Sequence, residues 1–270
     1  MEDSQKINAP IIHVIFRACD VVNAVNANPR PFDLDKTTLV KLSFQSLWDS
    51  LQHIPHTIHV IGDKLSPDLQ AFFQEKNVNL IEGDFGNDES IRQTLLLGAR
   101  FPAEDWVYFC EDDYVHVPHA MTFIHNFLQN PASFMNHTKR LYTWSSFINL
   151  KKKDIVIHPT DYPDRYSGKY RRFSLILHSN DCHWRQITDT TFTFLIQGKT
   201  LHKKLPFLLR CAKGANDRLL SRKLYGRFTF FGKVLALSPI PGLATHMHRD
   251  TMTPLINWES IIEDVRRRIL

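Results

Sequence analysis

The feature that most constrains the fold is an apolar run at residues 106–110 that ends abruptly in three acidic residues, Glu111, Asp112 and Asp113. A continuous apolar run with aromatic and β-branched residues predicts a strand whose two faces are both covered by helices, as in a parallel sheet. In open α/β sheets, ligands bind outside the carboxyl ends of the strands. The three carboxylates are therefore expected at the mouth of a binding site.

Three adjacent carboxylates repel one another, and a hard divalent cation would relieve that repulsion. Mg²⁺ is typically held by one or two carboxylates, while substrate phosphates and waters complete its shell. The sequence thus predicts a divalent metal site at the end of this strand. The alternative is an acidic turn that caps the next helix, since short acidic triplets are common in loops.

Before this strand, apolar runs alternate with helical patterns. Strands are predicted at residues 11–16, 57–61 and 79–81. Helices are predicted after Asp35, which can act as a cap, after Ser66 and Pro67, and over residues 90–99. This alternation predicts an α/β fold in which a mostly parallel central sheet of βαβ units is flanked by helices.

The second half of the chain is less regular. A helix is predicted over residues 118–128, and strands are predicted at residues 141–150, 173–177, 190–196 and 234–237. Residues 151–185 are basic with interleaved aromatics, which suits either a surface that neutralises a diphosphate or stacks a base, or a solvated face. Trp184, among polar neighbours, would suit a platform for a sugar ring, but core packing is the favoured interpretation of a single Trp.

Charge and cysteine content limit the partners and the compartment. The 270-residue chain has a formal net charge of +5 and a sequence pI near 9.0, which fits a nucleotide, nucleic acid or an acidic membrane surface. Its four cysteines lie far apart, so neither a zinc ribbon nor a disulfide framework is indicated. With no apolar signal core or membrane-length apolar run, we expect a soluble cytoplasmic protein.

Two downstream segments carry further candidates. Gly214 precedes a predicted helix start, and Asp217 lies in the first turn, where the helix dipole favours a carboxylate and where capping is an alternative role. His246 and His248 follow the last predicted strand. Residues at i and i+2 face the same side only in an extended segment, so at most one of these histidines is expected to bind a metal.

In combination, these features resemble a metal-dependent glycosyltransferase of the GT-A fold, over most of the chain. The (Asp/Glu)-x-Asp motif of that family is matched by Glu111 and Asp113, and its late metal histidine by His246. Its acceptor-side Glu-Asp motif is approached by Asn216 and Asp217. The chain departs from the family in having Asn216 where many relatives have an acid.

The resemblance implies one GT-A-like domain over residues 1–270. Residues 11–117 would form the nucleotide-sugar-binding half, and residues 118–270 would form a smaller acceptor-side half with a C-terminal helix. Mn²⁺ or Mg²⁺ would bind to the metal ligands Glu111, Asp113 and His246. Family position further implies that Arg17, Asp63 and Asn87 contact the nucleotide. Asp112 is expected to bind the cofactor, where it or Glu111 would assist Asp113.

The implied reaction moves a hexosyl group from a nucleotide-diphosphate sugar, with a UDP-sugar expected, to a saccharide or other hydroxyl acceptor, as in polysaccharide biosynthesis. An inverting enzyme needs a carboxylate base near the acceptor hydroxyl, and Asp217 is the candidate. Peripheral membrane association is compatible with the basic balance of the chain.

Two other functions remain open. A sugar nucleotidyltransferase would suit the same sheet and metal, although the glycine-rich loop usual after its first strand is absent. A nucleic-acid-binding module would use residues 151–185 and would not need the acids at residues 111–113. Because those acids lie at a strand end, no nucleic-acid partner is expected.

Overall fold

The computed structural model describes residues 10–20, 30–129, 153–167, 174–177, 182–225 and 234–269. The strands are β1 (Ile12–Cys19), β2 (His56–Asp63), β3 (Asn79–Gly83), β4 (Trp106–Glu111), β5 (Tyr114–His116), β6 (Asp154–Ile157), β7 (Ile176–Leu177), β8 (His183–Ile187), β9 (Phe194–Gln197), β10 (Val234–Ile240) and β11 (Ala244–His246). The α-helices are α1 (Lys36–Ser50), α2 (Pro67–Glu75), α3 (Gly86–Gly98), α4 (Ala120–Gln129), α6 (Gly198–Ala212), α7 (Asp217–Leu224) and α8 (Trp258–Ile269). Short 3₁₀ turns are η1 (Pro31–Asp33), η4 (Pro163–Tyr166) and η5 (Arg249–Thr251).

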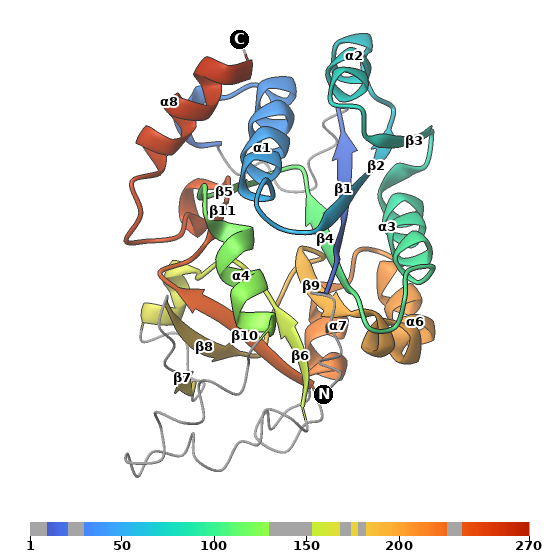
Figure 1. Ribbon diagram of the computed structural model, residues 1–270, viewed down its shortest axis with the longest axis vertical. Coiled ribbons are helices and arrows are strands. Elements are labelled where there is room, and N and C mark those ends of the chain that lie inside the picture. The colour runs from blue at the N-terminus through green and yellow to red at the C-terminus, as the bar shows by residue number, and fades with distance from the viewer. Residues whose placement is uncertain are drawn as a thin grey trace, which may run out of the picture.

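The predicted α/β fold is confirmed. Within the described residues, one nine-stranded sheet has the order β3-β2-β1-β4-β9-β6-β10-β8-β7 (Figure 1). Strands β3, β2, β1 and β4 are parallel, as are β6 and β10, whereas the remaining neighbours are antiparallel. The sheet is therefore mixed rather than parallel throughout, because the strand-helix alternation that favours parallel pairing is confined to the amino half.

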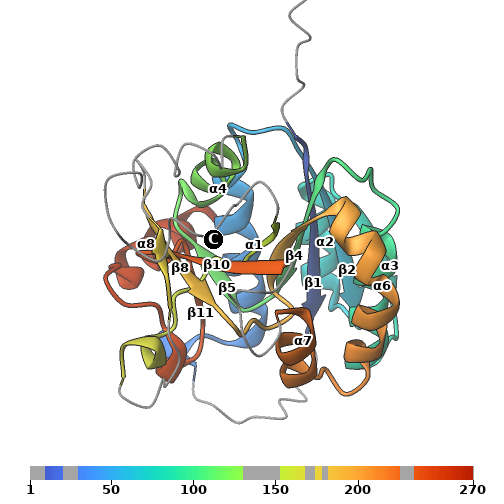
Figure 2. The same cartoon turned by 90° about the horizontal axis from the view of Figure 1, so that it is seen from below.

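Helices cover both faces of the sheet, as Figure 2 shows from below. Helices α1, α2, α4 and α8 pack on one face, and α3, α6 and α7 pack on the other. The central strand β4 serves both cores. Its Tyr108 and Cys110 belong to the first core, while Val107 and Phe109 belong to the second. The apolar run is thus buried on both sides, as its composition predicts.

Helix starts are predicted correctly where the capping residue directly precedes the helix in the sequence. Asp35 caps α1 by accepting a hydrogen bond from the Thr38 amide, and Ser66 caps α2 in the same way, as predicted. Helix α3 begins at Gly86, four residues earlier than predicted, because a carboxylate distant in the sequence supplies its first partner. The Asp63 carboxylate accepts from the backbone amides of Phe85 and Gly86 at 2.7 and 3.1 Å.

Other sequence-based expectations are partly confirmed and partly corrected. Trp184 is only 1% exposed and stacks on Phe127 with ring centroids 4.4 Å apart, so core packing, the interpretation favoured from the sequence, is confirmed over the sugar platform. The strand expected from residue 190 begins at Phe194, and the last strand of the sheet continues to Ile240. The strand predicted at residues 141–150 lies outside the described residues.

A second, two-stranded sheet brings the late part of the chain to the acidic residues. Strand β11 pairs antiparallel with β5, so that His246 lies opposite Tyr114. The Met247 amide extends this pairing by donating to the carbonyl of Asp113 at 2.8 Å. Among the helices of the described segments, none is both long and apolar enough to cross a membrane.

Candidate functional site

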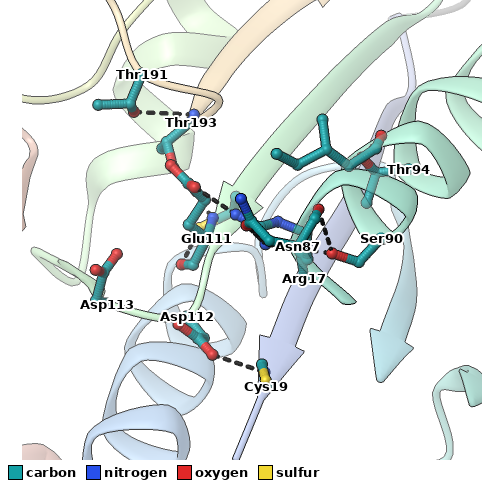
Figure 3. Close-up of polar contacts among 12 residues, drawn as sticks. Arg17, Cys19, Asn87, Ser90, Thr94, Glu111, Asp112, Asp113, Thr191 and Thr193 are labelled. Carbon is teal, nitrogen blue, oxygen red and sulfur yellow. Dashed lines mark hydrogen bonds and ion pairs between the residues drawn. The ribbon is translucent and has the colours of Figure 1, made fainter. Parts of the chain in front are cut away.

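The candidate site lies at the carboxyl ends of β1 and β4, where the strand order of the parallel half reverses. Arg17 and Glu111 are register partners across these two strands. The guanidinium of Arg17 donates to the Glu111 carboxylate at 2.5 Å, and to Asn87 Oδ1 and Ser90 Oγ at 3.1 and 3.3 Å (Figure 3). Three residues predicted from the sequence are therefore brought into one hydrogen-bonded group.

Nearby carboxylates favour the charged form of Arg17. Burial works against the charge on Arg17, but the carboxylates of Glu111, Asp112 and Asp113 outweigh it and raise the pKa of the guanidinium. The second oxygen of Glu111 accepts from Thr193 Oγ1 at 3.3 Å, and the Glu111 amide donates back to Thr193 at 3.0 Å. Glu111 thus has a cationic partner from the protein itself.

Asp112 has a different cationic partner. Its carboxylate accepts from the Cys19 amide at 2.8 Å and from Lys36 Nζ at 2.6 Å. Lys36 is largely buried, and although burial opposes its charge, Asp112 and Asp113 raise its pKa above the ordinary value. No local pattern in the sequence points to Lys36 or Thr193, since each reaches the acids from a distant segment.

Asp113 points away from the other two acids and meets two histidines. Its Oδ2 lies 3.0 Å from His246 Nε2 and 3.5 Å from His248 Nε2. One ligand atom from each of these three residues lies within 4.8 Å of the others, which makes them a group able to hold a metal ion. Glu111 is not part of this group, and its predicted role as a metal ligand stays a prediction.

The fit of a cation to this group can be judged from Asp113. Its Oδ1 is buried and has no hydrogen-bond partner among the described residues. Burial opposes the charge on Asp113, but the imidazoles of His246 and His248 hold its pKa well below the ordinary value. A partly buried, ionised carboxylate with one buried, unpartnered oxygen beside two imidazoles has the donor atoms and the charge that a divalent cation needs.

Both histidines reach Asp113 because the backbone is extended here. His248 has φ −124° and ψ 136°, and β11 ends at His246, so residues at i and i+2 share one side. The expectation that at most one histidine would face the metal position therefore does not describe the geometry. His248 joins the candidate ligands beside the predicted His246.

Aromatic and hydroxyl groups surround His246. The Tyr114 ring is parallel to the imidazole within 1°, with centroids 4.7 Å apart. The Tyr114 hydroxyl shares hydrogen bonds with Tyr162 Oη at 2.8 Å and Thr191 Oγ1 at 2.9 Å. Burial disfavours the imidazolium, but Asp113 outweighs it and raises the pKa of His246. Sequence reasoning missed all three of these hydroxyl residues, because none belongs to a recognisable motif.

Asp217 is the first residue of α7 and is not its capping side chain. Asn216 performs that role by accepting from the Leu219 amide at 2.8 Å. The Asp217 Oδ1 is buried without a hydrogen bond from the described residues. Burial and then the charge of Glu111 raise the pKa of Asp217 to about 7, against the opposing charges of Arg17 and His246. A carboxyl group with this pKa can exchange a proton at neutral pH.

The remaining predicted residue, Asp63, is 5% exposed at the end of β2. Its carboxylate holds the start of α3, which carries Asn87 into reach of Arg17. The structure thus places Asp63 behind the site as a support for one of its side chains. Its predicted contact with a nucleotide stays a prediction.

Comparisons with known proteins name no family for the chain. No family model matches, and no curated protein matches. Among solved structures, TarS of S. aureus is similar over 96% of this chain, with 12% identity and a TM-score of 0.46. This chain spans only 38% of the length of TarS. The galactosyltransferase LgtC, in complex with donor and acceptor sugar analogs, has 11% identity and a TM-score of 0.43 over 83% of this chain and 72% of LgtC.

A third solved structure belongs to another class of transferase. The 4-diphosphocytidyl-2C-methyl-D-erythritol synthase of Anaerococcus prevotii has 10% identity and a TM-score of 0.43, covering 97% of both chains. With TM-scores below 0.5, these similarities are too distant to assign a reaction to this chain.

Proposed function

We propose that the chain is a divalent-metal-dependent glycosyltransferase that moves a sugar from a nucleotide-diphosphate sugar to an acceptor hydroxyl with inversion. One observation carries the proposal: the Asp217 carboxyl group, with a pKa of about 7, interacts electrostatically with His246, which belongs to the three-residue group able to hold a metal ion. A cation held by the three-residue group would suit an anionic diphosphate, and the Asp217 carboxyl group suits removal of a proton from a hydroxyl. The motif resemblance of Glu111, Asp113 and His246 supports the same function.

Asp113, His246 and His248 would hold the cation. When bound, the cation would neutralise negative charge on the diphosphate leaving group. Two imidazole nitrogens and one carboxylate oxygen suit a transition ion such as Mn²⁺ better than Mg²⁺, which binds mainly oxygen ligands. A nucleoside diphosphate would complete the shell, because the protein supplies only three ligand atoms in this group.

Asp217 would act as the base. In its ionised form it accepts the proton of the acceptor hydroxyl while that oxygen bonds to the anomeric carbon of the sugar. The bond from the anomeric carbon to the diphosphate oxygen breaks, and the diphosphate leaves with the electron pair. An unpartnered carboxylate oxygen is suited to this task, since no internal hydrogen bond has to be given up.

Arg17 and Lys36 would supply the remaining positive charges of the site. Each is already paired with an acid, Arg17 with Glu111 and Lys36 with Asp112, so the site is not strongly positive before substrate binds. These ion pairs fix the carboxylates at the strand end. Of the three adjacent acids, Asp113 is the one paired with titratable imidazoles instead of an arginine or a lysine.

The test is a panel of nucleotide sugars incubated with the protein, Mn²⁺ and a set of saccharide acceptors. Release of nucleoside diphosphate that depends on Mn²⁺ and on an acceptor would support the proposal. A parallel panel of nucleoside triphosphates with sugar phosphates examines the nucleotidyltransferase alternative, whose product is pyrophosphate. Pyrophosphate release in that panel, with no diphosphate release in the first, would contradict the glycosyltransferase proposal.

A further inference from the structure

Helices α6 and α7 together carry an unusual share of the positive charge. Residues 198–224 contain one acid, Asp217, and eight basic residues, namely Lys199, Lys203, Lys204, Arg210, Lys213, Arg218, Arg222 and Lys223. The whole chain has 33 basic and 28 acidic residues, so the rest of the chain has 25 basic and 27 acidic residues. The positive excess of the protein therefore comes entirely from this helix pair.

All of these basic residues except Lys204, which is partly exposed, face solvent. On α6, the side of the helix that bears Lys199, Lys203 and Arg210 is exposed, while Leu201 and Leu208 are buried against the sheet. On α7, the basic positions 218, 222 and 223 are exposed in the same way. The two helices contact each other and lie next to each other at the periphery of the molecule in Figures 1 and 2. The basic positions of these two helices and of the short segment between them are called here the basic helix pair.

The charges of the basic helix pair are not neutralised by ion pairs with the described residues. None of its eight cations forms an ion pair with another residue of the part of the chain that the structure describes. By contrast, Arg267 and Arg268 on α8 pair with Asp264 and Asp49. The acid of the segment, Asp217, interacts with Glu111, Arg17 and His246 in the site. Eight cations without internal counterions are available to an external anionic surface.

We propose that the basic helix pair binds the anionic surface of a lipid bilayer. An anionic bilayer attracts clustered basic residues near its surface, and the exposed stripe of α6 presents Lys199, Lys203 and Arg210. The flanking Leu205, Phe207 and Leu209 pack against the core of the protein, so the expected attraction is electrostatic. Single-stranded nucleic acid would instead need exposed aromatic platforms, and none of the exposed large hydrophobic residues of the described chain lies in α6 or α7. The inference rests on this surface and is independent of the proposed reaction.

The test is co-sedimentation of the full chain with vesicles of phosphatidylcholine alone and with vesicles in which about a third of the lipid is phosphatidylglycerol. We expect binding to the anionic vesicles only, and a decrease in binding as salt is raised. The variant Lys203→Glu, Arg210→Glu should bind them about 30-fold more weakly, because each basic residue near an anionic bilayer contributes to affinity.

The matched control is Arg267→Glu, Arg268→Glu, which lowers the net charge by the same four units on the opposite helical layer. This control should bind anionic vesicles within about twofold of wild type. Equal loss in both variants would show that net charge rather than this surface is responsible, and would overturn the proposal. Tight binding to a duplex or single-stranded oligonucleotide, with no binding to anionic vesicles, would overturn it as well.

Discussion

The ring of Tyr114 lies flat against the imidazole of His246, within 1° of parallel and 4.7 Å between centroids. Tyr114 itself is fully buried, and its hydroxyl is held by Tyr162 and Thr191. An imidazole fixed in this way presents Nε2 toward Asp113 in one orientation, so Tyr114 acts as a positioning residue for the candidate metal group.

We expect Tyr114→Phe to keep the stacked ring and to change the Mn²⁺ affinity by less than about threefold, whereas Tyr114→Leu should weaken it by about 10- to 100-fold, as for other groups that orient a metal ligand. Calorimetric titration with Mn²⁺ alone measures both. Thermal melts of the two variants serve as the control for folding. Equal Mn²⁺ affinity in a folded Tyr114→Leu protein would contradict the positioning role.

Asp113→Ala should abolish Mn²⁺ binding while the protein remains folded. Substitution removes the carboxylate but not the backbone carbonyl that accepts from the Met247 amide, so the pairing of β5 with β11 is preserved. Titration with Mn²⁺ and a nucleoside diphosphate, next to a circular dichroism spectrum, tests this. Unchanged affinity in a folded variant would remove Asp113 from the metal group.

His246→Ala and His248→Ala should each weaken Mn²⁺ binding, by at least about tenfold. The sequence favours His246 alone, whereas the geometry includes His248, whose Nε2 is 3.5 Å from Asp113. The Mn²⁺ electron paramagnetic resonance signal of free ion, measured against protein concentration, reports both variants. Normal binding by His248→Ala would restrict the group to the ligands expected from the sequence.

Asp217→Asn should retain donor binding and lose transfer. Removal of a general base typically lowers the rate by about 10²- to 10⁴-fold, while the helix keeps its cap because that role belongs to Asn216. In wild type, kcat should rise with pH through about 7, as Asp217 ionises. The measurements are kcat and donor Kd side by side, and near wild-type turnover would contradict the role as base.

The same carboxyl group predicts a pH-dependent effect on stability. Its pKa is about 7 in the folded protein, against an ordinary pKa of 3.8 in the unfolded chain, so the unfolded state loses the proton first as pH rises. Wild type therefore loses stability between about pH 4 and 7 at this site. Asp217→Asn does not titrate, and should be more stable than wild type above pH 7 by roughly 1 to 3 kcal/mol, with no gain near pH 4.

Urea unfolding of both proteins at pH 4 and pH 8 measures this difference. The control is Asp88→Asn, which removes an acid on α3 that holds the Gly214 amide at 2.7 Å and is exposed. This control should not be stabilised at pH 8. A stability difference between Asp217→Asn and wild type that does not change with pH would show that the Asp217 carboxyl group does not titrate with a raised pKa.

The amino half of the fold could be predicted because its signals are local. Asp35 and Ser66 mark helix starts through hydrogen bonds to residues three positions later, and the apolar run before Glu111 implies burial on both faces. The polar neighbours of Trp184 made a sugar platform conceivable, but sequence neighbours on a strand point to opposite faces and do not show what a side chain packs against.

The site could be predicted only where chemistry is concentrated in the sequence. The acids at residues 111–113 stand out, but their partners Lys36 and Thr193 reach them only through the folded sheet. From the sequence, His248 is only the less favoured of the two candidate histidines, for a related reason. Its direction depends on an extended backbone, which is set by pairing with the segment around Asp113.

The pairing of β5 with β11 also determines when the metal group can exist during folding. Asp113 and His246 are 133 positions apart in the sequence. Their side chains therefore meet only after most of the intervening chain has folded into the sheet. Contacts of such long range form late, because the entropy of a large loop must be lost before the contact compensates for it. A nascent or half-folded chain therefore contains the acids but no chelating group, and capture of Mn²⁺ would report that folding is complete.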